Sequence, residues 1–81
     1  MTAEELKDYV SCGREIEFEY NGKRYSITYG EFAPDGEISF CEFYKESTEV
    51  MSVEELLKVE RNGITVEEML ANCPEEDIDI F

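Results

Sequence analysis

Two groups of carboxylates have the residue types and spacing to bind a positively charged surface. Glu15 and Glu17 alternate with apolar residues in the segment EIEFEY, and the segment EEDIDIF adds Glu75, Glu76, Asp77 and Asp79. Residues two apart on a β-strand lie on one face, about 6.7 Å apart, so such carboxylates form a row that lysine and arginine side chains can meet. The alternative is a solvated strand face and a frayed terminus.

Catalytic chemistry has few candidates in this sequence. The chain has no histidine and no glycine-rich phosphate loop, which removes the commonest general base, the commonest transition-metal ligand and a nucleotide site. Cys12, Cys41 and Cys73 lack the spacing of a zinc site or of a disulfide framework, so we expect buried, reduced thiols. The acidic turn around Asp35 lacks the spacing of an EF-hand calcium loop. We therefore predict a protein that is not an enzyme and binds no metal or cofactor.

The charge balance limits the possible partners. The chain carries 21 Asp and Glu against 7 Lys and Arg, a formal net charge of -14. Direct binding to nucleic acid or to an anionic membrane requires clustered Lys and Arg, so the composition argues against both. No segment has the pattern of a signal peptide or a membrane span. We expect a cytoplasmic protein of a bacterial host cell whose partner is a basic protein.

Three segments share the signature of a helix start. In MTAEELK, MSVEELL and ITVEEML a hydroxyl residue is followed three positions later by Glu, which is the capping-box arrangement. The pattern predicts a helix from Ala3 to Ser11, a second helix that begins at Val53, and a third that begins at Val66 and ends before Pro74.

The alternating segment EIEFEYNGKRYSITY predicts a β-hairpin. Asn-Gly at positions 21 and 22 is the preferred sequence of a two-residue type I′ turn. Counting outward from this turn pairs Phe18 with Tyr25 and Ile16 with Ile27, so the apolar residues of both strands share one face. On the other face, Glu19 lies opposite Arg24.

The remaining elements complete a small α+β fold. A loop with Pro34 and Gly36 as turn residues leads to EISFCEFY, whose imperfect alternation predicts a third strand with a bulge near Cys41 or with both faces covered. We expect one domain over residues 1–81 with a three-stranded antiparallel β-meander and short helices packed on one face. The segment from Asp77 to Phe81 can add an edge strand.

The composition resembles that of a functional class of proteins. The small size, the charge of -14, the lack of histidine and the segments EIEFEY and EEDIDIF are similar to those of the small acidic inhibitors of phages and mobile elements, including anti-CRISPR proteins and the uracil-DNA glycosylase inhibitor. The resemblance covers the composition of the whole chain but no motif. It implies an inhibitor that mimics nucleic acid.

Two functions follow as hypotheses. The first is a non-enzymatic inhibitor that occupies the basic nucleic-acid-binding surface of a bacterial defence nuclease or a related protein. The second is an adaptor that docks through DIDIF, by strand addition or with its terminal phenylalanine in a pocket. The predicted partner-binding residues are Glu15, Glu17, Glu75, Glu76, Asp77, Asp79 and Phe81. Aromatic residues near the acids are candidate apolar anchors, with core packing as their alternative role: Tyr20, Tyr29, Tyr44 and Phe81.

Overall fold

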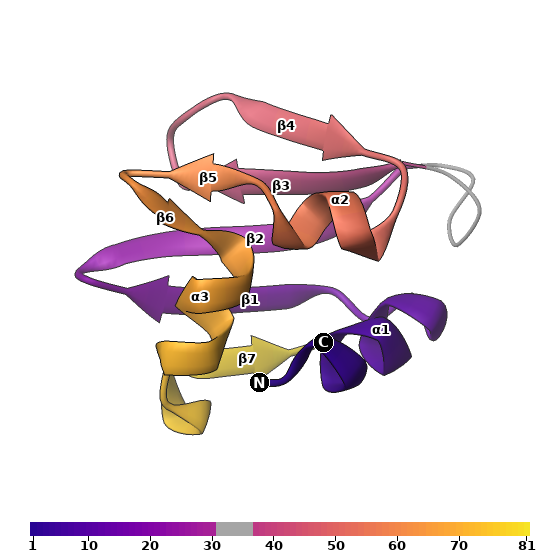
Figure 1. Ribbon diagram of the computed structural model, residues 1–81, viewed down its shortest axis with the longest axis horizontal. Coiled ribbons are helices and arrows are strands. Elements are labelled where there is room, and N and C mark those ends of the chain that lie inside the picture. The colour runs from indigo at the N-terminus through magenta and orange to yellow at the C-terminus, as the bar shows by residue number, and fades with distance from the viewer. Residues whose placement is uncertain (31–36) are drawn as a thin grey trace.

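The chain folds into one antiparallel sheet covered by short helices (Figure 1). A computed structural model describes residues 1–30 and 37–81, so the loop expected around Pro34 and Gly36, with the acidic turn at Asp35, lies outside the described residues. The elements, in chain order, are α1 (Ala3–Ser11), β1 (Ile16–Tyr20), β2 (Lys23–Tyr29), β3 (Ile38–Glu42), β4 (Ser47–Val50), α2 (Val53–Leu57), β5 (Glu60–Arg61), β6 (Ile64–Thr65), α3 (Val66–Asn72), the 3-10 helix η1 (Glu75–Asp77) and β7 (Ile78–Ile80).

The main sheet has five strands in the order β4-β3-β2-β1-β7. The small single-domain α+β fold is therefore confirmed, but the predicted three-strand count is too low. The meander continues into β4, which the sequence analysis did not identify, and β7 pairs with β1 at the opposite edge. A second sheet joins only β5 and β6.

Local signals determine the hairpin and the helix starts as predicted. Phe18 pairs with Tyr25 and Ile16 with Ile27, and both turn residues have the positive φ that type I′ requires, 52° at Asn21 and 76° at Gly22. The three hydroxyl residues at the helix N-caps each accept a hydrogen bond from the backbone N–H of the Glu three positions later. In α1, Glu5 also accepts from the N-cap backbone, which completes the capping box.

The strand β3 is regular, so the predicted bulge or two-sided burial near Cys41 is wrong. The ladder with β2 continues without interruption through Cys41 to Glu42, which pairs with Tyr25. The strand then ends, and Phe43 and Tyr44 belong to the turn that leads into β4. The imperfect alternation in the sequence therefore marks the end of a strand.

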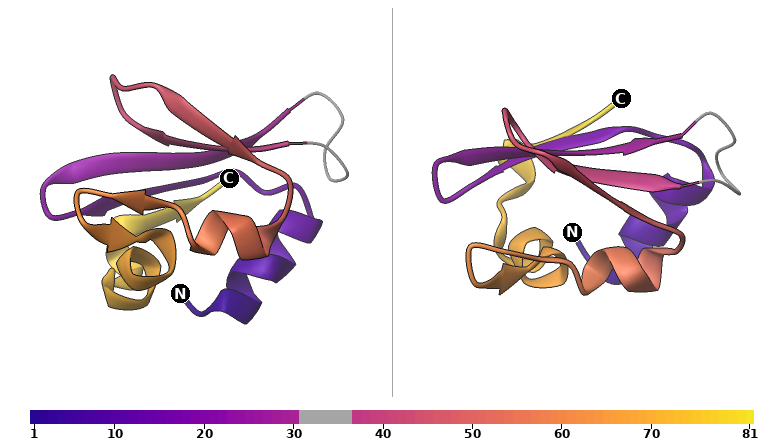
Figure 2. Two further views of the ribbon diagram at one scale, coloured as in Figure 1. Left: turned by 45° about the horizontal axis from the view of Figure 1, so that its top comes forward. Right: turned by 90° about the horizontal axis from the view of Figure 1, so that it is seen from above.

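All three α-helices pack on the same face of the sheet. Figure 2 shows the sheet nearly edge-on with the helices on one side. The buried core lies between these layers and centres on the rings of Phe18, Tyr25 and Phe40, in which Tyr25 stacks on both neighbours at centroid distances of 5.3 and 5.5 Å. Leu6, Leu56 and the α3 residues Val66, Met69 and Leu70 close this core from the helical side.

The hairpin of β5 and β6 covers the end of the core that the helices leave open. Its turn at Asn62 and Gly63 has positive φ at both residues, as at the first hairpin. Asn62 donates to the hydroxyl of Tyr25 at 3.1 Å, which satisfies the polar atom of a buried ring. Arg61 lies over the Phe40 ring, 5.9 Å from its centroid.

The three thiols differ in exposure. All are free, but only Cys73 is buried, while Cys41 is partly exposed and Cys12 is exposed. The expectation of buried thiols is therefore wrong for Cys12, which is the C-cap of α1 and lies beyond its last turn, and for Cys41, which is only partly buried.

The central aromatic stack makes a stability prediction. We expect Phe40→Ala to lower the free energy of unfolding by about 3–5 kcal/mol, because Phe40 is fully buried and its loss leaves a cavity. Phe43→Ala is the matched control: this ring is only partly buried, and we expect a loss of about 1 kcal/mol or less. Urea unfolding measures both values, and equal losses would contradict the packing described here.

Candidate protein-interaction surface

Among residues 1–30 and 37–81, no helix lies on one face of the sheet, and the strand side chains on that face are polar. Because side chains alternate along a strand, burying Ile16, Phe18, Tyr25 and Ile27 on the helical side places their neighbours on the open side. The open face therefore carries an acidic row on β1 and β7, Arg24 on β2 and Glu49 on β4, with small side chains elsewhere on β2, β3 and β4: Ser26, Thr28, Ser39, Cys41 and Ser47. The centre of this face is polar.

The pairing of β7 with β1 brings Asp79 beside three glutamates of the β1 segment, and we call these four carboxylates the acidic patch. This pairing sets Asp79 directly opposite Glu17. Glu19 lies two residues along β1, and Glu15 continues the alternation at the other end, where its carbonyl accepts from the Phe81 N–H at 2.8 Å. The acidic patch is thus defined as Glu15, Glu17, Glu19 and Asp79.

Arg24 on β2 partly neutralises the acidic patch. Its guanidinium lies 3.4 Å from the carboxylate of Glu17, 3.9 Å from that of Glu19 and 3.5 Å from that of Asp79. These side chains are all at least one-third exposed, so each pair contributes only about 0–1 kcal/mol to stability. Four carboxylates and one guanidinium give these five side chains a formal net charge of -3.

Two aromatic residues flank the same face at the turn between β3 and β4. The Arg24 guanidinium lies 5.7 Å from the centroid of the Phe43 ring, and Tyr44 packs edge-on against Phe43 at 6.3 Å. Tyr44 is 100% exposed and has a φ of 69°, a conformation that is strained for a bulky residue. A fully exposed ring on a strained backbone adds no core packing that would explain its presence.

The structure brings together some of the predicted binding residues and separates others. Glu15, Glu17 and Asp79 lie in the acidic patch, and Phe81 lies beside them with 59% exposure. Glu75 instead lines a pocket between α1 and β7, on the helical side of the sheet. Glu76 and Asp77 are exposed on η1. The two groups of acids therefore do not form the single continuous surface considered from the sequence.

Glu19, expected only as a cross-strand neighbour of Arg24, also belongs to the open face, because the alternation that places Glu15 and Glu17 there includes it. Of the candidate anchors, Tyr44 and Phe81 are exposed, whereas Tyr20 and Tyr29 are half-buried against the core. The Tyr29 hydroxyl donates to the Arg14 carbonyl at 2.6 Å. Burial, with the nearby Glu15 carboxylate, raises the pKa of Tyr29 to about 12.

The described residues offer no evident catalytic or metal centre. Within residues 1–30 and 37–81, no group of three or more His, Cys, Asp or Glu side chains is arranged to hold a metal ion. Burial raises the pKa of the Cys73 thiol, and the carboxylate of Asp77 acts in the same direction, which disfavours the reactive thiolate. In the same part of the chain, no helix has both the length and the apolar character needed to cross a membrane.

Comparisons of this chain with protein-family models, with curated proteins and with solved structures give no match.

The strained turn makes a second stability prediction. We expect Tyr44→Gly to raise the free energy of unfolding by about 0.5–1 kcal/mol, because glycine adopts a positive φ without strain and the exposed ring contributes little burial. The adjacent Lys45→Gly is the control, since Lys45 has no positive φ and the substitution only adds unfolded-state entropy. A loss of stability in both variants, measured by urea unfolding, would show that Tyr44 is not strained.

The position of Glu15 makes a prediction about Tyr29. Replacing Glu15 by Gln removes a negative charge that disfavours the tyrosinate, so the pKa of Tyr29 falls from about 12 toward its usual value of 10. Carbon NMR of the tyrosine rings during an alkaline titration measures this shift, with Glu46→Gln as the control. An unchanged pKa would place Glu15 away from Tyr29.

Because the pKa of Tyr29 is higher in the folded than in the unfolded state, its contribution to stability is complete below pH 10. It is lost as the pH rises from about 10 to about 12. The Tyr29→Phe variant lacks this ionisation, so its stability should fall less over the same interval.

Proposed function

We propose that this protein is a non-enzymatic inhibitor that binds the basic nucleic-acid-binding surface of a bacterial defence nuclease or another nucleic-acid-processing protein. It acts in the bacterial cytoplasm and presents its acidic patch where the partner would otherwise hold phosphates. This proposal carries forward the resemblance in composition to phage-borne inhibitors.

The observation that carries the proposal is the position of Glu17 beside Asp79 on the open face. Like charges directly opposite each other on neighbouring strands destabilise a sheet, and Arg24 offsets only part of this repulsion because three carboxylates share it. Lysine and arginine side chains of a partner would attract both carboxylates. Such side chains line surfaces that bind nucleic-acid phosphates, so a surface of this kind fits the acidic patch. The net charge of -14 adds long-range attraction that speeds encounter with a basic partner.

The aromatic residues Phe43 and Tyr44 can add the apolar contacts that carboxylates lack. Exposed carboxylates contribute mainly to association rate and specificity, whereas affinity in protein interfaces comes largely from a few buried aromatic and arginine anchors. Tyr44, exposed beside Phe43 at the edge of the open face, is suited to enter a pocket on the partner. The surface then combines an electrostatic face with one apolar anchor.

The alternative adaptor function is less compatible with the ladder between β1 and β7 in one of its forms, the docking of DIDIF as a released peptide. Strand addition at the outer edge of β7 leaves this ladder intact. The DIDIF segment is not a free peptide, because Ile78 and Ile80 pack against the core and Phe81 bonds to Glu15. Docking it as a released peptide would require these contacts to break first.

A triple amide variant tests the proposed function. We would combine Glu15→Gln, Glu17→Gln and Asp79→Asn, and compare it with Asp8→Asn, Glu60→Gln and Glu67→Gln, three exposed acids on helices or on β5. Both variants lose three negative charges, so their net charges are equal. The parent and the two variants are each used as bait to capture proteins from bacterial lysate at low salt. The protein that the parent captures is then purified.

We expect the parent and the control to displace a labelled oligonucleotide from the captured protein. The acidic-patch variant should require about tenfold more protein for the same displacement. Equal displacement by both variants, or capture only of proteins that bind no nucleic acid, would contradict the proposed function. Circular dichroism would verify that all three proteins are folded.

A further inference from the structure

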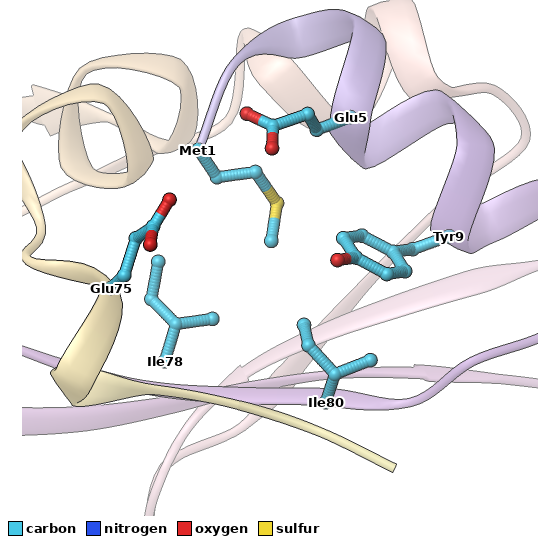
Figure 3. A pocket seen from close by; sticks show the side chains of 6 residues that line it. All are labelled: Met1, Glu5, Tyr9, Glu75, Ile78 and Ile80. Carbon is cyan, nitrogen blue, oxygen red and sulfur yellow. The ribbon is translucent and has the colours of Figure 1, made fainter.

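A small pocket lies between α1 and the edge strand β7, on the opposite face of the sheet from the acidic patch. Its lining residues converge from the two elements, as Figure 3 shows: Met1, Glu5 and Tyr9 from the α1 side, and Glu75, Ile78 and Ile80 from η1 and β7. The volume is about 190 Å³. Pockets for small organic ligands usually hold about 300–1,000 Å³, so this one is sized for a single side chain.

The strand beside this pocket has unpaired backbone groups. β7 is the last strand in the order of the main sheet. Along an antiparallel ladder, residue pairs that exchange backbone hydrogen bonds alternate with pairs that do not. The Phe81 N–H donates to the Glu15 carbonyl, so Asp79 and Glu17, two positions along, form the next hydrogen-bonded pair. Ile78 and Ile80 then direct their backbone groups outward. The Ile78 N–H is taken by the Glu75 carbonyl, which leaves the Ile80 N–H and both carbonyls for an added strand.

The pocket combines apolar walls with acidic groups. Met1, Ile78 and Ile80 present apolar side chains, and the carboxylates of Glu5 and Glu75 lie at its rim. The bond that Glu5 accepts from the Thr2 backbone lowers the pKa of its carboxyl, so it stays ionised. The Met1 nitrogen is engaged with the Leu70 carbonyl at 2.8 Å. Among residues 1–30 and 37–81, no hydrogen bond or ion pair reaches the side chain of Glu75.

Apolar walls with carboxylates at the rim favour a lysine or arginine side chain as the occupant of the pocket. Lysine and arginine side chains lay an apolar stem along apolar surface while the charged head reaches polar groups. Such a stem fits between Met1 and the two isoleucines, and its head reaches the carboxylates of Glu5 and Glu75. A second copy of this chain, with a net charge of -14, is a poor source of the segment because the two copies repel each other.

We propose that the outer edge of β7 accepts an extended segment of a basic partner protein, which pairs with the backbone at Ile80 and inserts one arginine or lysine side chain into the pocket. This contact goes beyond the proposed function, since it lies on the helical side of the sheet and uses no residue of the acidic patch. It is strand addition, in which the backbone provides pairing and one pocket provides selectivity.

A capped pentapeptide, Thr-Val-Arg-Val-Thr, is the probe for this contact. Its control replaces arginine by citrulline, which keeps the shape but removes the charge. On the protein side, Glu75→Gln is compared with Glu76→Gln, the next residue, which does not line the pocket. Two-dimensional NMR reports the affinity from amide shifts, and hydrogen exchange reports whether the Ile80 amide becomes protected.

We expect the arginine peptide to protect the Ile80 amide, and the citrulline peptide and the Glu75→Gln variant to weaken binding by about tenfold each. Glu76→Gln and the triple acidic-patch variant should bind as the parent does. Equal affinity for both peptides, no protection at Ile80, or an equal loss in the acidic-patch variant would overturn the proposal. This last outcome would leave the proposed function of the acidic patch standing.

Discussion

The antiparallel ladder between β1 and β7 keeps the carboxylates of the acidic patch side by side although they repel one another. It sets Glu17 beside Asp79, a repulsive pair. Two contributions offset the repulsion: Ile78 and Ile80 pack against the core on the other side of β7, and Arg24 lies within ion-pair distance of both acids. The same ladder forms one wall of the pocket beside α1 and exposes an unpaired strand edge. Both proposed interaction surfaces therefore depend on a three-residue strand.

A chain of this length can bury little more than one layer of apolar contacts, and the distribution of its side chains follows from that limit. The apolar residues of the strands and the inner faces of three short helices form one core on one side. The other side of the sheet carries small hydroxyl side chains, carboxylates and the exposed ring of Tyr44. A surface without core function is free to be selected for binding, and its charge pattern is the reason for the basic partner proposed above.

Local signals made much of this fold predictable from sequence. Capping residues and the Asn21–Gly22 turn act within a few positions, so the helix starts and the hairpin register are correct. The strand β4 was missed because Phe43 extends the apparent alternation past the end of β3. The pairing of β7 with β1 joins segments that are far apart in the sequence, so no local pattern predicts it. The turn at η1 places Glu75 on the helical side of the sheet. Sequence alone therefore marks the acids as candidates but does not show which of them lie together.

The most direct measurement of the central claim is an NMR footprint of the protein bound to a purified nucleic-acid-binding partner. If the open face is the docking surface, the amide shifts concentrate on β1, β2 and β7 near Glu17 and Asp79, and at Tyr44 in the turn between β3 and β4. Addition of a competing oligonucleotide should reverse them. Shifts confined to α2, α3 and the hairpin of β5 and β6, with the open face unchanged, would contradict the account.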